Sequence, residues 1–306
     1  DDVVERVRPD WVLSQGDTTT AMVASLVAFY RGAKFGHVEA GLRTGDKHRP
    51  FPEEINRRIA DLVADQYFAP TERARKALIE EGVDDSAIHV VGNTVIDALL
   101  EIASRSYDFS QAPLDKLPRD KRLVLITTHR RESFGKNLRQ CCLAIRDLVA
   151  TFQKEGIHFV YLVHLNPNVK APVHEMLSGY DNITLLPPVE YAAMVHLMKR
   201  STLILTDSGG IQEEAPSLKV PVLVMREKTE RPEGVEAGVT RLVGTDRKKI
   251  VADAEKLLRD PAAKAEMSGE NPYGDGKSAQ RIVNILYHHA QSVDKNASNR
   301  RPYQGK

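Results

Sequence analysis

The stretch TLILTDSGGIQEEAPSL, residues 202–218, combines an apolar run, a turn on two glycines and a helical segment. Aliphatic and β-branched residues fill the run up to Asp207, which is typical of a buried strand. Pro216 follows soon after the expected helix start and limits that helix to a short one. A strand that leads through a glycine turn into a helix is the repeating unit of a parallel sheet. This stretch therefore predicts an α/β fold.

Similar units repeat along the whole chain. Apolar runs alternate with amphipathic stretches, and the runs expected as strands are residues 11–15, 34–39, 66–70, 88–92, 122–129, 158–164, 182–188, 202–207, 220–225 and 240–244. The polar segment 106–121 lacks periodicity and predicts an interdomain linker. The pattern predicts two Rossmann-like, doubly wound domains whose strand ends face a cleft.

We expect an N-terminal domain over residues 1–112 and a C-terminal domain over residues 113–277. A further helix, SAQRIVNILYHHA at residues 278–290, follows a turn-rich segment. We expect residues 278–306 to form this helix and a tail, with the helix crossing back to the first domain.

Composition excludes several classes of partner. Forty-three Lys and Arg against 42 Asp and Glu give a net charge of +1, so no global field attracts nucleic acid or an anionic membrane. No apolar run approaches the length of about 18 residues that a membrane span needs. The two cysteines, Cys141 and Cys142, are adjacent, where a disulfide would be strained and a zinc site lacks ligands. We expect a reduced, cytoplasmic setting without nucleic-acid partners or membrane insertion.

The glycine turn after residue 207 suits a phosphate. Ser208, Gly209 and Gly210 stand at the start of the expected helix, where free N–H groups and the helix dipole attract anions. Glu214 lies on the next turn, where its carboxylate could accept hydrogen bonds from ribose hydroxyls. The alternative is that Glu213 and Glu214 are solvated helix residues.

Two further basic residues follow expected strands. Arg231 could provide a second phosphate or base-side contact, and the alternative is an exposed salt bridge. His129 ends a strand and could neutralise a leaving phosphate, although a strand-end histidine is more often structural. His164 is interpreted as a turn residue. GDGKSA, residues 274–279, has the spacing of a dinucleotide fingerprint, but no strand precedes it, so we reject it.

The first half carries three carboxylates at strand ends or helix starts. Asp17 follows the first strand, Glu39 ends the second, and Glu53 opens a helix. Each has a simpler reading, such as Asp17 as a helix N-cap and Glu53 as a first-turn acid. Together, carboxylates that converge on a cleft are typical of proton transfer at carbon.

Eight motifs carry a resemblance to one family. From about Pro9 to Gly276, these are QGDTTTAM, HVEAGLRTGD, PEEINRR, THRRESFGKNL, VHLNPNV, LTDSGGIQEEAPSLKVPVLVMR, TERPE and NPYGDG. The sequence resembles the bacterial non-hydrolysing UDP-N-acetylglucosamine 2-epimerases, which have a GT-B fold. The resemblance implies reversible C2 epimerisation of UDP-N-acetylglucosamine to UDP-N-acetylmannosamine without metal or nicotinamide cofactor.

The resemblance also assigns roles. It implies that the segments around Asp17, Glu39, Glu53 and His129 carry the catalytic groups. It implies that a second set of residues holds the uridine diphosphate, namely Ser208, Gly209, Gly210, Glu214 and Arg231.

The sequence departs from the family pattern at its start, where a GTRPE-type phosphate and sugar loop is expected and the first βα units are lacking. We expect the natural polypeptide to extend upstream and to form a homodimer. Other functions stay open: a hydrolysing 2-epimerase that releases N-acetylmannosamine and UDP, a GT-B transferase, or a non-catalytic UDP-sugar sensor.

Overall fold

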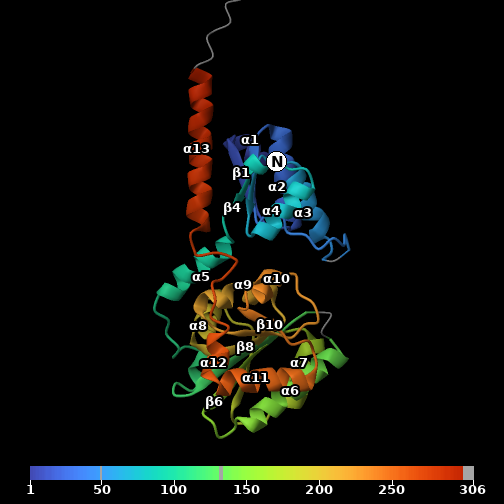
Figure 1. Cartoon of the computed structure of the whole chain (residues 1–306), viewed down its shortest axis with the longest axis vertical. Coiled ribbons are helices and arrows are strands. Elements are labelled where there is room, and N and C mark those ends of the chain that lie inside the picture. Colours follow the sequence, from blue (N-terminus) through green and yellow to red (C-terminus); the bar gives the residue numbers. More distant parts are fainter. Residues whose placement is uncertain (49, 131–133, 299–306) are drawn as a thin grey trace, which may run out of the picture. The chain divides into compact units, whose positions relative to one another are not determined.

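The computed structural model describes residues 1–48, 50–130 and 134–298, with side chains up to residue 291. The chain forms two compact units (Figure 1). One unit combines Asp1–Asp97 with Tyr273–Lys306, and the other is Ala98–Pro272. The boundary predicted at residues 112 and 113 falls within the second unit.

The first unit contains a parallel four-stranded sheet in the order β1-β2-β3-β4. Its strands are β1 (Trp11–Gln15), β2 (Lys34–Val38), β3 (Gln66–Ala69) and β4 (Ile88–Val90). Its first helices are α1 (Asp2–Val7), α2 (Thr19–Arg31), α3 (Glu53–Leu62) and α4 (Glu72–Glu80). Phe35 packs with α2 and α3, and Tyr67 packs with α4. Both side chains lie on the same face of the sheet, since Tyr67 pairs with His37, two residues after Phe35.

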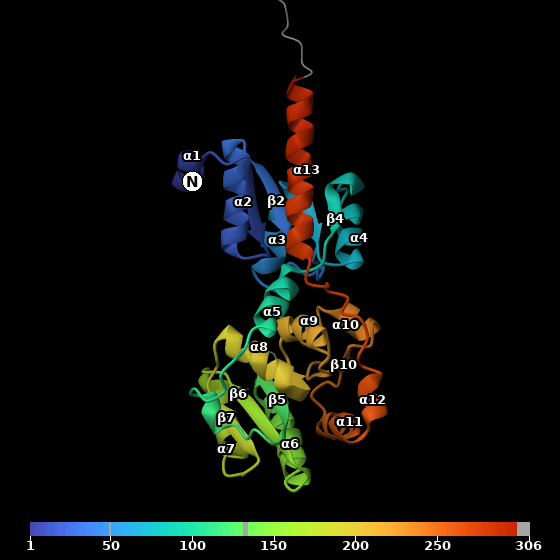
Figure 2. The ribbon, with the colours of Figure 1, turned by 90° about the vertical axis from the view of Figure 1, so that its left-hand side faces the viewer.

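The other face of this sheet is covered by α13 (Ser278–Ser298). Ile282 packs against Phe68 and Val91, and the His289 ring lies edge-on to Trp11 at 5.2 Å between centroids. Figure 2 shows α13 alongside the strands. This C-terminal helix therefore helps to complete the core of the first unit. Among the described residues, no helix is long and apolar enough to cross a membrane.

The second unit contains a parallel six-stranded sheet in the order β10-β9-β8-β5-β6-β7. Its strands are β5 (Arg122–Thr128), β6 (Ile157–Val163), β7 (Ile183–Leu186), β8 (Ser201–Thr206), β9 (Val222–Val224) and β10 (Thr240–Leu242). The chain proceeds from β5 to β7 on one side and then returns to place β8 on the other side of β5. This reversal is the doubly wound topology, and the ends of β5 and β8 mark its switch point.

Helices cover both faces of the second sheet. They are α6 (Lys136–Thr151), α7 (Pro167–Leu177), α8 (Tyr191–Arg200), α9 (Gly209–Glu214), α10 (Pro232–Glu236), α11 (Arg247–Arg259) and α12 (Pro261–Ala265), while α5 (Thr94–Ser104) runs across the division between the units. Cys141 and Cys142 are free and buried in α6, and burial raises the pKa of each thiol to about 12.

The segment 106–121, predicted as a linker, packs against the second unit. Leu114 and Leu117 are buried in its core, and the Tyr107 ring stacks on His196 at 4.9 Å between centroids. These apolar side chains lack a regular period because they belong to an irregular loop with one short 3-10 turn at Leu114–Lys116. Their burial anchors the loop to the sheet's helices.

Candidate active site

Asp17 lies in the loop after β1 and is held from α3. The Asp17 carboxylate accepts a hydrogen bond from Arg57, and Asn56 Nδ2 donates to the Asp17 carbonyl at 2.9 Å. The N-cap alternative for Asp17 is wrong, because Thr18 caps α2 by accepting the Ala21 N–H at 3.2 Å. The Asp17 side chain is thereby available for another role, with its position fixed by an arginine.

Glu39 follows β2 in an uncommon backbone conformation. Its φ of 70° lies in the left-handed region, which glutamate rarely adopts. The Glu39 N–H donates to the Phe68 carbonyl at 3.0 Å, and a Cβ on Gly16 would lie 3.3 Å from Glu39 Oε2. The Glu39 carboxylate thus lies against Gly16, in the loop that also carries Asp17.

Glu53 is the first residue of α3, the helix that also supplies Arg57. Its Oε2 atom is buried and has no hydrogen-bond partner within the described ranges. An acid in the first turn of a helix is favoured by the dipole, but a buried and unsatisfied carboxylate oxygen costs free energy. Such a group in a native structure points to a functional role.

Sequence reasoning missed a buried pair beneath these loops. His37 of β2 is completely buried; its Nδ1 donates to Asp61 Oδ1 at 2.5 Å and its Nε2 donates to the Gly16 carbonyl at 2.8 Å. Both partners only accept hydrogen bonds, so the imidazole carries two protons. Burial opposes this, but the hydrogen bond and the charge of Asp61 raise the pKa of His37 above its ordinary value.

A second missed residue is Glu54. Its buried carboxylate accepts the backbone N–H groups of Thr44 at 3.1 Å and Gly45 at 3.2 Å, and it pairs with Arg57 at 3.2 Å. The three-residue spacing from Glu54 to Arg57 on an expected helix was a signal for this pair. Glu54 therefore ties the loop before α3 to the arginine that holds Asp17.

In the second unit, Asp207 organises the loop after β5. Its fully buried carboxylate accepts the backbone N–H groups of His129 and Arg130 at 3.0 Å each, and His129 Nδ1 lies 3.1 Å from Oδ1. Burial would raise the pKa of Asp207, but the contacts with His129 and Arg130 lower it below its ordinary value. The sequence pattern predicted no role for Asp207. Its position at a strand end was the available signal.

Two guanidinium groups surround the start of α9. A Cβ on Gly209 would lie 3.3 Å from Arg130 Nη2 and 4.0 Å from Arg231 Cζ. Arg130 Nε is buried without a hydrogen-bond partner in the described part of the chain. Ser208 is the N-cap residue of α9, yet its side chain makes no capping bond. A side chain at residue 209 would crowd these cations, and their close approach to the backbone suits an anion.

The two glutamates of α9 are buried, so the alternative that they are solvated helix residues is wrong. Glu213 pairs with Arg231, whose side chain is only 20% exposed, so the exposed-salt-bridge alternative for Arg231 is also wrong. Glu214 Oε1 accepts a hydrogen bond from the Tyr191 hydroxyl at 2.5 Å. Burial raises the pKa of Glu214 to about 7, although the hydrogen bond from Tyr191 opposes the shift.

The remaining expectations concern residues of the second unit. His164 accepts the Asn166 N–H at 3.1 Å, and Asn166 caps α7, which confirms the turn. The His129 and His164 rings lie 6.2 Å apart. Gly210 has ordinary contacts, with Ser208 Oγ 4.0 Å from a Cβ built on it.

A unit with strand-end carboxylates and a doubly wound unit with cations around a glycine turn define an α/β enzyme that acts on a phosphorylated substrate. The sequence profile of the UDP-N-acetylglucosamine 2-epimerase family matches residues 1–287. The chain belongs to this family.

Individual relatives agree. A UDP-N-acetylglucosamine 2-epimerase of Escherichia coli K12 is 50% identical over 291 residues, which is 93% of this chain and 77% of that protein. The crystal structure of the Neisseria meningitidis UDP-GlcNAc 2-epimerase bound to UDP-GlcNAc has a TM-score of 0.84 and 43% identity, over 94% of this chain and 78% of that chain. The S. aureus MnaA–UDP co-structure has a TM-score of 0.86 and 41% identity, over 95% and 78%. The family resemblance and the GT-B fold class predicted from the sequence are confirmed.

Proposed function

We propose that the chain inverts C2 of UDP-N-acetylglucosamine to give UDP-N-acetylmannosamine, and the reverse. Relatives named for this epimerisation, at about half identity, support the proposal. Within the structure, the observation that supports the proposal is the buried Oε2 atom of Glu53, which has no hydrogen-bond partner among the described residues. Glu53 lies on the same helix as Arg57, which donates to Asp17.

The chemistry requires that the leaving group be bound first. The C2 proton is not next to a ketone, so it becomes acidic only when the bond from C1 to UDP breaks and positive charge develops at C1. Cations stabilise the departing diphosphate. We assign this role to His129, Arg130 and Arg231, the last two of which flank Gly209.

A carboxylate then removes the C2 proton. The products of this elimination are UDP and a 2-acetamidoglucal, in which C1 and C2 share a double bond. UDP re-adds to C1 while a second acid gives a proton to C2 from the opposite face, which inverts C2. Asp17 and Glu53 are the two proton-transfer groups of this proposal, and Glu39, which packs on Gly16, orients the sugar.

The nucleotide is held by the second unit. The Ser208 hydroxyl, which is not used for capping, and the backbone at Gly209 and Gly210 contact the diphosphate. Glu214, oriented by Tyr191, accepts the ribose hydroxyls. Arg231, which pairs with the buried Glu213, contributes its positive charge to the phosphate site.

Proton NMR of UDP-N-acetylglucosamine in heavy water tests the function. The wild-type protein should exchange deuterium into C2 of the intact nucleotide sugar, and Asp17→Asn and Glu53→Gln should each slow this exchange by at least about a hundredfold. Glu72→Gln is the matched control, because Glu72 is also the first residue of a helix but is exposed.

Other outcomes would replace the proposal. Free N-acetylmannosamine with UDP would indicate a hydrolysing enzyme in which water captures C1. Transfer of the sugar to an added acceptor would indicate a GT-B transferase. UDP binding without exchange would indicate a sensor, and full exchange by both variants would remove these acids from the mechanism.

We also propose that the enzyme is a cytoplasmic homodimer. Exposed apolar residues on α3 support a second copy, since the Leu62 side chain is 83% exposed and Ile55 is 38% exposed. Light scattering should give twice the chain mass for the wild type and a smaller mass for Leu62→Glu. A wild-type monomer would contradict the dimer.

A further inference from the structure

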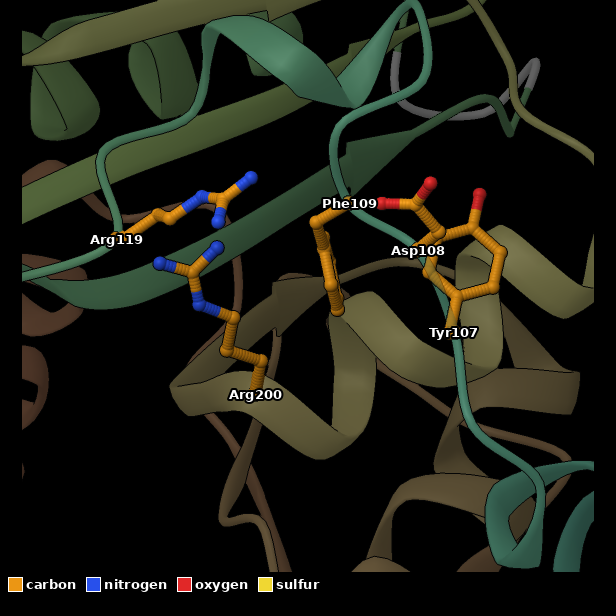
Figure 3. A pocket seen from close by; sticks show the side chains of 5 residues that line it. All are labelled: Tyr107, Asp108, Phe109, Arg119 and Arg200. Atoms are coloured by element: carbon orange, nitrogen blue, oxygen red, sulfur yellow. The ribbon is translucent and has the colours of Figure 1, made fainter.

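The second unit has a cavity near the starts of β5 and β8, at the other end of these strands from His129 and Asp207. The cavity has a volume of about 320 Å³ and is lined by Tyr107, Asp108, Phe109, Arg119 and Arg200 (Figure 3). Arg200 ends α8 directly before β8 begins, whereas Asp207 follows the other end of β8. A strand of six residues spans about 20 Å, so this cavity is separate from the nucleotide site.

Two guanidinium groups point toward one another in this cavity (Figure 3). No carboxylate lies within ion-pair distance of Arg119 or Arg200 among the residues that the structure describes. Asp108 lines the same cavity, but its Oδ1 accepts the Ser110 N–H at 2.8 Å and its carboxylate lies across the Phe109 ring from the guanidinium groups. Hydrogen bonds from Ser110 lower the pKa of Asp108 and the charge of Arg119 contributes, so Asp108 offsets part of the positive charge. The two adjacent guanidinium groups still repel each other, and an anion between them would reduce that cost.

Arg200 is fixed in position by neutral groups. Its Nη2 donates to the Pro118 carbonyl, and its guanidinium lies over the Phe109 ring at 5.2 Å from the centroid. The half-buried side chain is thus already ordered before any ligand arrives, and a rigid donor loses less entropy on binding. Burial lowers the pKa of Arg200, with a further contribution from the charge of Arg119.

The pKa of a neighbouring histidine is lowered in part by the same positive charges. His158, at the start of β6, is buried and contacts Thr184 Oγ1 at 2.7 Å through Nε2. Burial lowers its pKa to about 4, and the charges of Lys121 and Arg200 contribute in the same direction. The cations at this edge of the sheet therefore act together on their surroundings.

We infer that this cavity is a binding site for a small phosphate dianion, separate from the nucleotide site. Guanidinium groups present paired N–H donors that match phosphate oxygens, and two of them on one cavity neutralise a double charge. Asp108 at the rim disfavours large polyanions, which would bring negative charge against it.

The aromatic side chains have partners within the protein. Arg200 lies over Phe109, and the Tyr107 ring stacks on His196 and contacts Phe109 edge-on at 5.1 Å. These contacts hold the rings in place beside the two guanidinium groups. The recognition that we infer rests on charge, which suits inorganic phosphate or a sugar phosphate.

Calorimetric titration of the whole chain with inorganic phosphate, at low ionic strength and with saturating UDP to fill the nucleotide site, tests this inference. We expect saturable binding by the wild type. Arg119→Gln and Arg200→Gln should each weaken it at least tenfold. The matched control is Arg259→Gln, because Arg259 also lies over a phenylalanine, Phe152, but has Glu155 as its ion-pair partner. Its affinity should equal that of the wild type.

Two further arms sharpen the result. Arg119 makes no hydrogen bond to a described residue and is exposed, so Arg119→Gln decides the matter if loss of the Arg200–Pro118 contact unfolds the other variant. Glucose 1-phosphate in place of phosphate shows whether a sugar phosphate is preferred. The inference is overturned if the wild type shows no saturable binding, or if Arg119→Gln and Arg259→Gln weaken binding equally.

Discussion

Each unit of the molecule contains one histidine paired with a buried aspartate, and the two pairs differ in what the second ring nitrogen can do. In the first unit, His37 is fully buried, and its two nitrogens contact Asp61 and the Gly16 carbonyl. In the second unit, the His129 side chain is 39% exposed, and only its Nδ1 contacts Asp207. Its Nε2 makes no hydrogen bond to any described residue.

In the proposed mechanism, this difference separates a supporting group from a reacting group. His37 keeps both protons, and its bond to Gly16 fixes the backbone beside Asp17. It cannot exchange a proton with a substrate because neither nitrogen reaches solvent. The contact with Asp207 sets the tautomer and ring orientation of His129, so we propose that its other nitrogen faces the substrate. An aspartate partner alone therefore does not identify a catalytic histidine.

The largest effect should come from His37→Asn. This change removes the buried partner of Asp61 and the donor to Gly16, and breaking a buried ion pair costs about 3 kcal/mol. The free energy of unfolding, measured by urea denaturation, should fall by about this amount. Arg43 also contacts Asp61, at 2.8 Å, and it limits the loss. A stability equal to the wild type would mean that the pair is not a support.

The same substitution in the second unit should have the opposite result. His129→Asn should reduce turnover by at least about a hundredfold, since a general acid or electrostatic group is lost. Its effect on unfolding should be smaller than that of His37→Asn, because the backbone N–H groups of His129 and Arg130 still donate to Asp207 in the variant. Turnover and the free energy of unfolding in urea should be measured for both His37→Asn and His129→Asn. Normal turnover with lost stability would place His129 with His37 as a supporting residue.

The sequence allowed the fold and the strand-end residues to be predicted because both follow from short-range patterns. All ten predicted strands are present; β1 has the predicted bounds, and the others differ from them by one or two residues at one or both ends. Asp17, Glu39 and His129 stand next to strand ends, where a parallel sheet places its functional loops. His37 lies inside a strand, where an alternating pattern marks only its burial.

The missed contacts join residues that are distant in sequence. Asp61 reaches His37 across 24 positions, and Arg57 reaches Asp17 across 40. Such pairs depend on how α3 packs on the sheet, which no local pattern specifies. The same applies to Arg119 and Arg200, which come together only because the loop before β5 packs on α8.

A smaller effect is expected at Glu214, the carboxylate that we propose holds the nucleotide. Glu214→Ala should weaken UDP binding by about 1.5 to 3 kcal/mol, the scale of a hydrogen bond to a charged group. Calorimetry measures this value directly. Tyr191→Phe is the companion variant, because it removes only the hydroxyl that orients Glu214 and should cost about 1 kcal/mol. If neither variant changes UDP affinity, Glu214 is a structural residue.

The smallest effect concerns pH. Because burial raises the pKa of Glu214 to about 7, its folded state favours the protonated form, and its contribution to stability falls as pH rises from about 4.5 to 7. UDP binding has the opposite sign, since ribose hydroxyls donate more strongly to an ionised carboxylate.

We therefore expect UDP affinity to increase by up to about tenfold between pH 6 and pH 8, by the linkage between ionisation and binding. The phosphate of UDP also titrates near a pH of about 6, so the comparison is with Glu214→Gln, which retains that titration. Calorimetry at several pH values should give a steeper slope for the wild type than for Glu214→Gln. Parallel slopes would show that Glu214 does not change its ionisation when UDP binds. The comparison between a buried histidine that keeps its protons, His37, and a group that exchanges them would then depend on His129 alone.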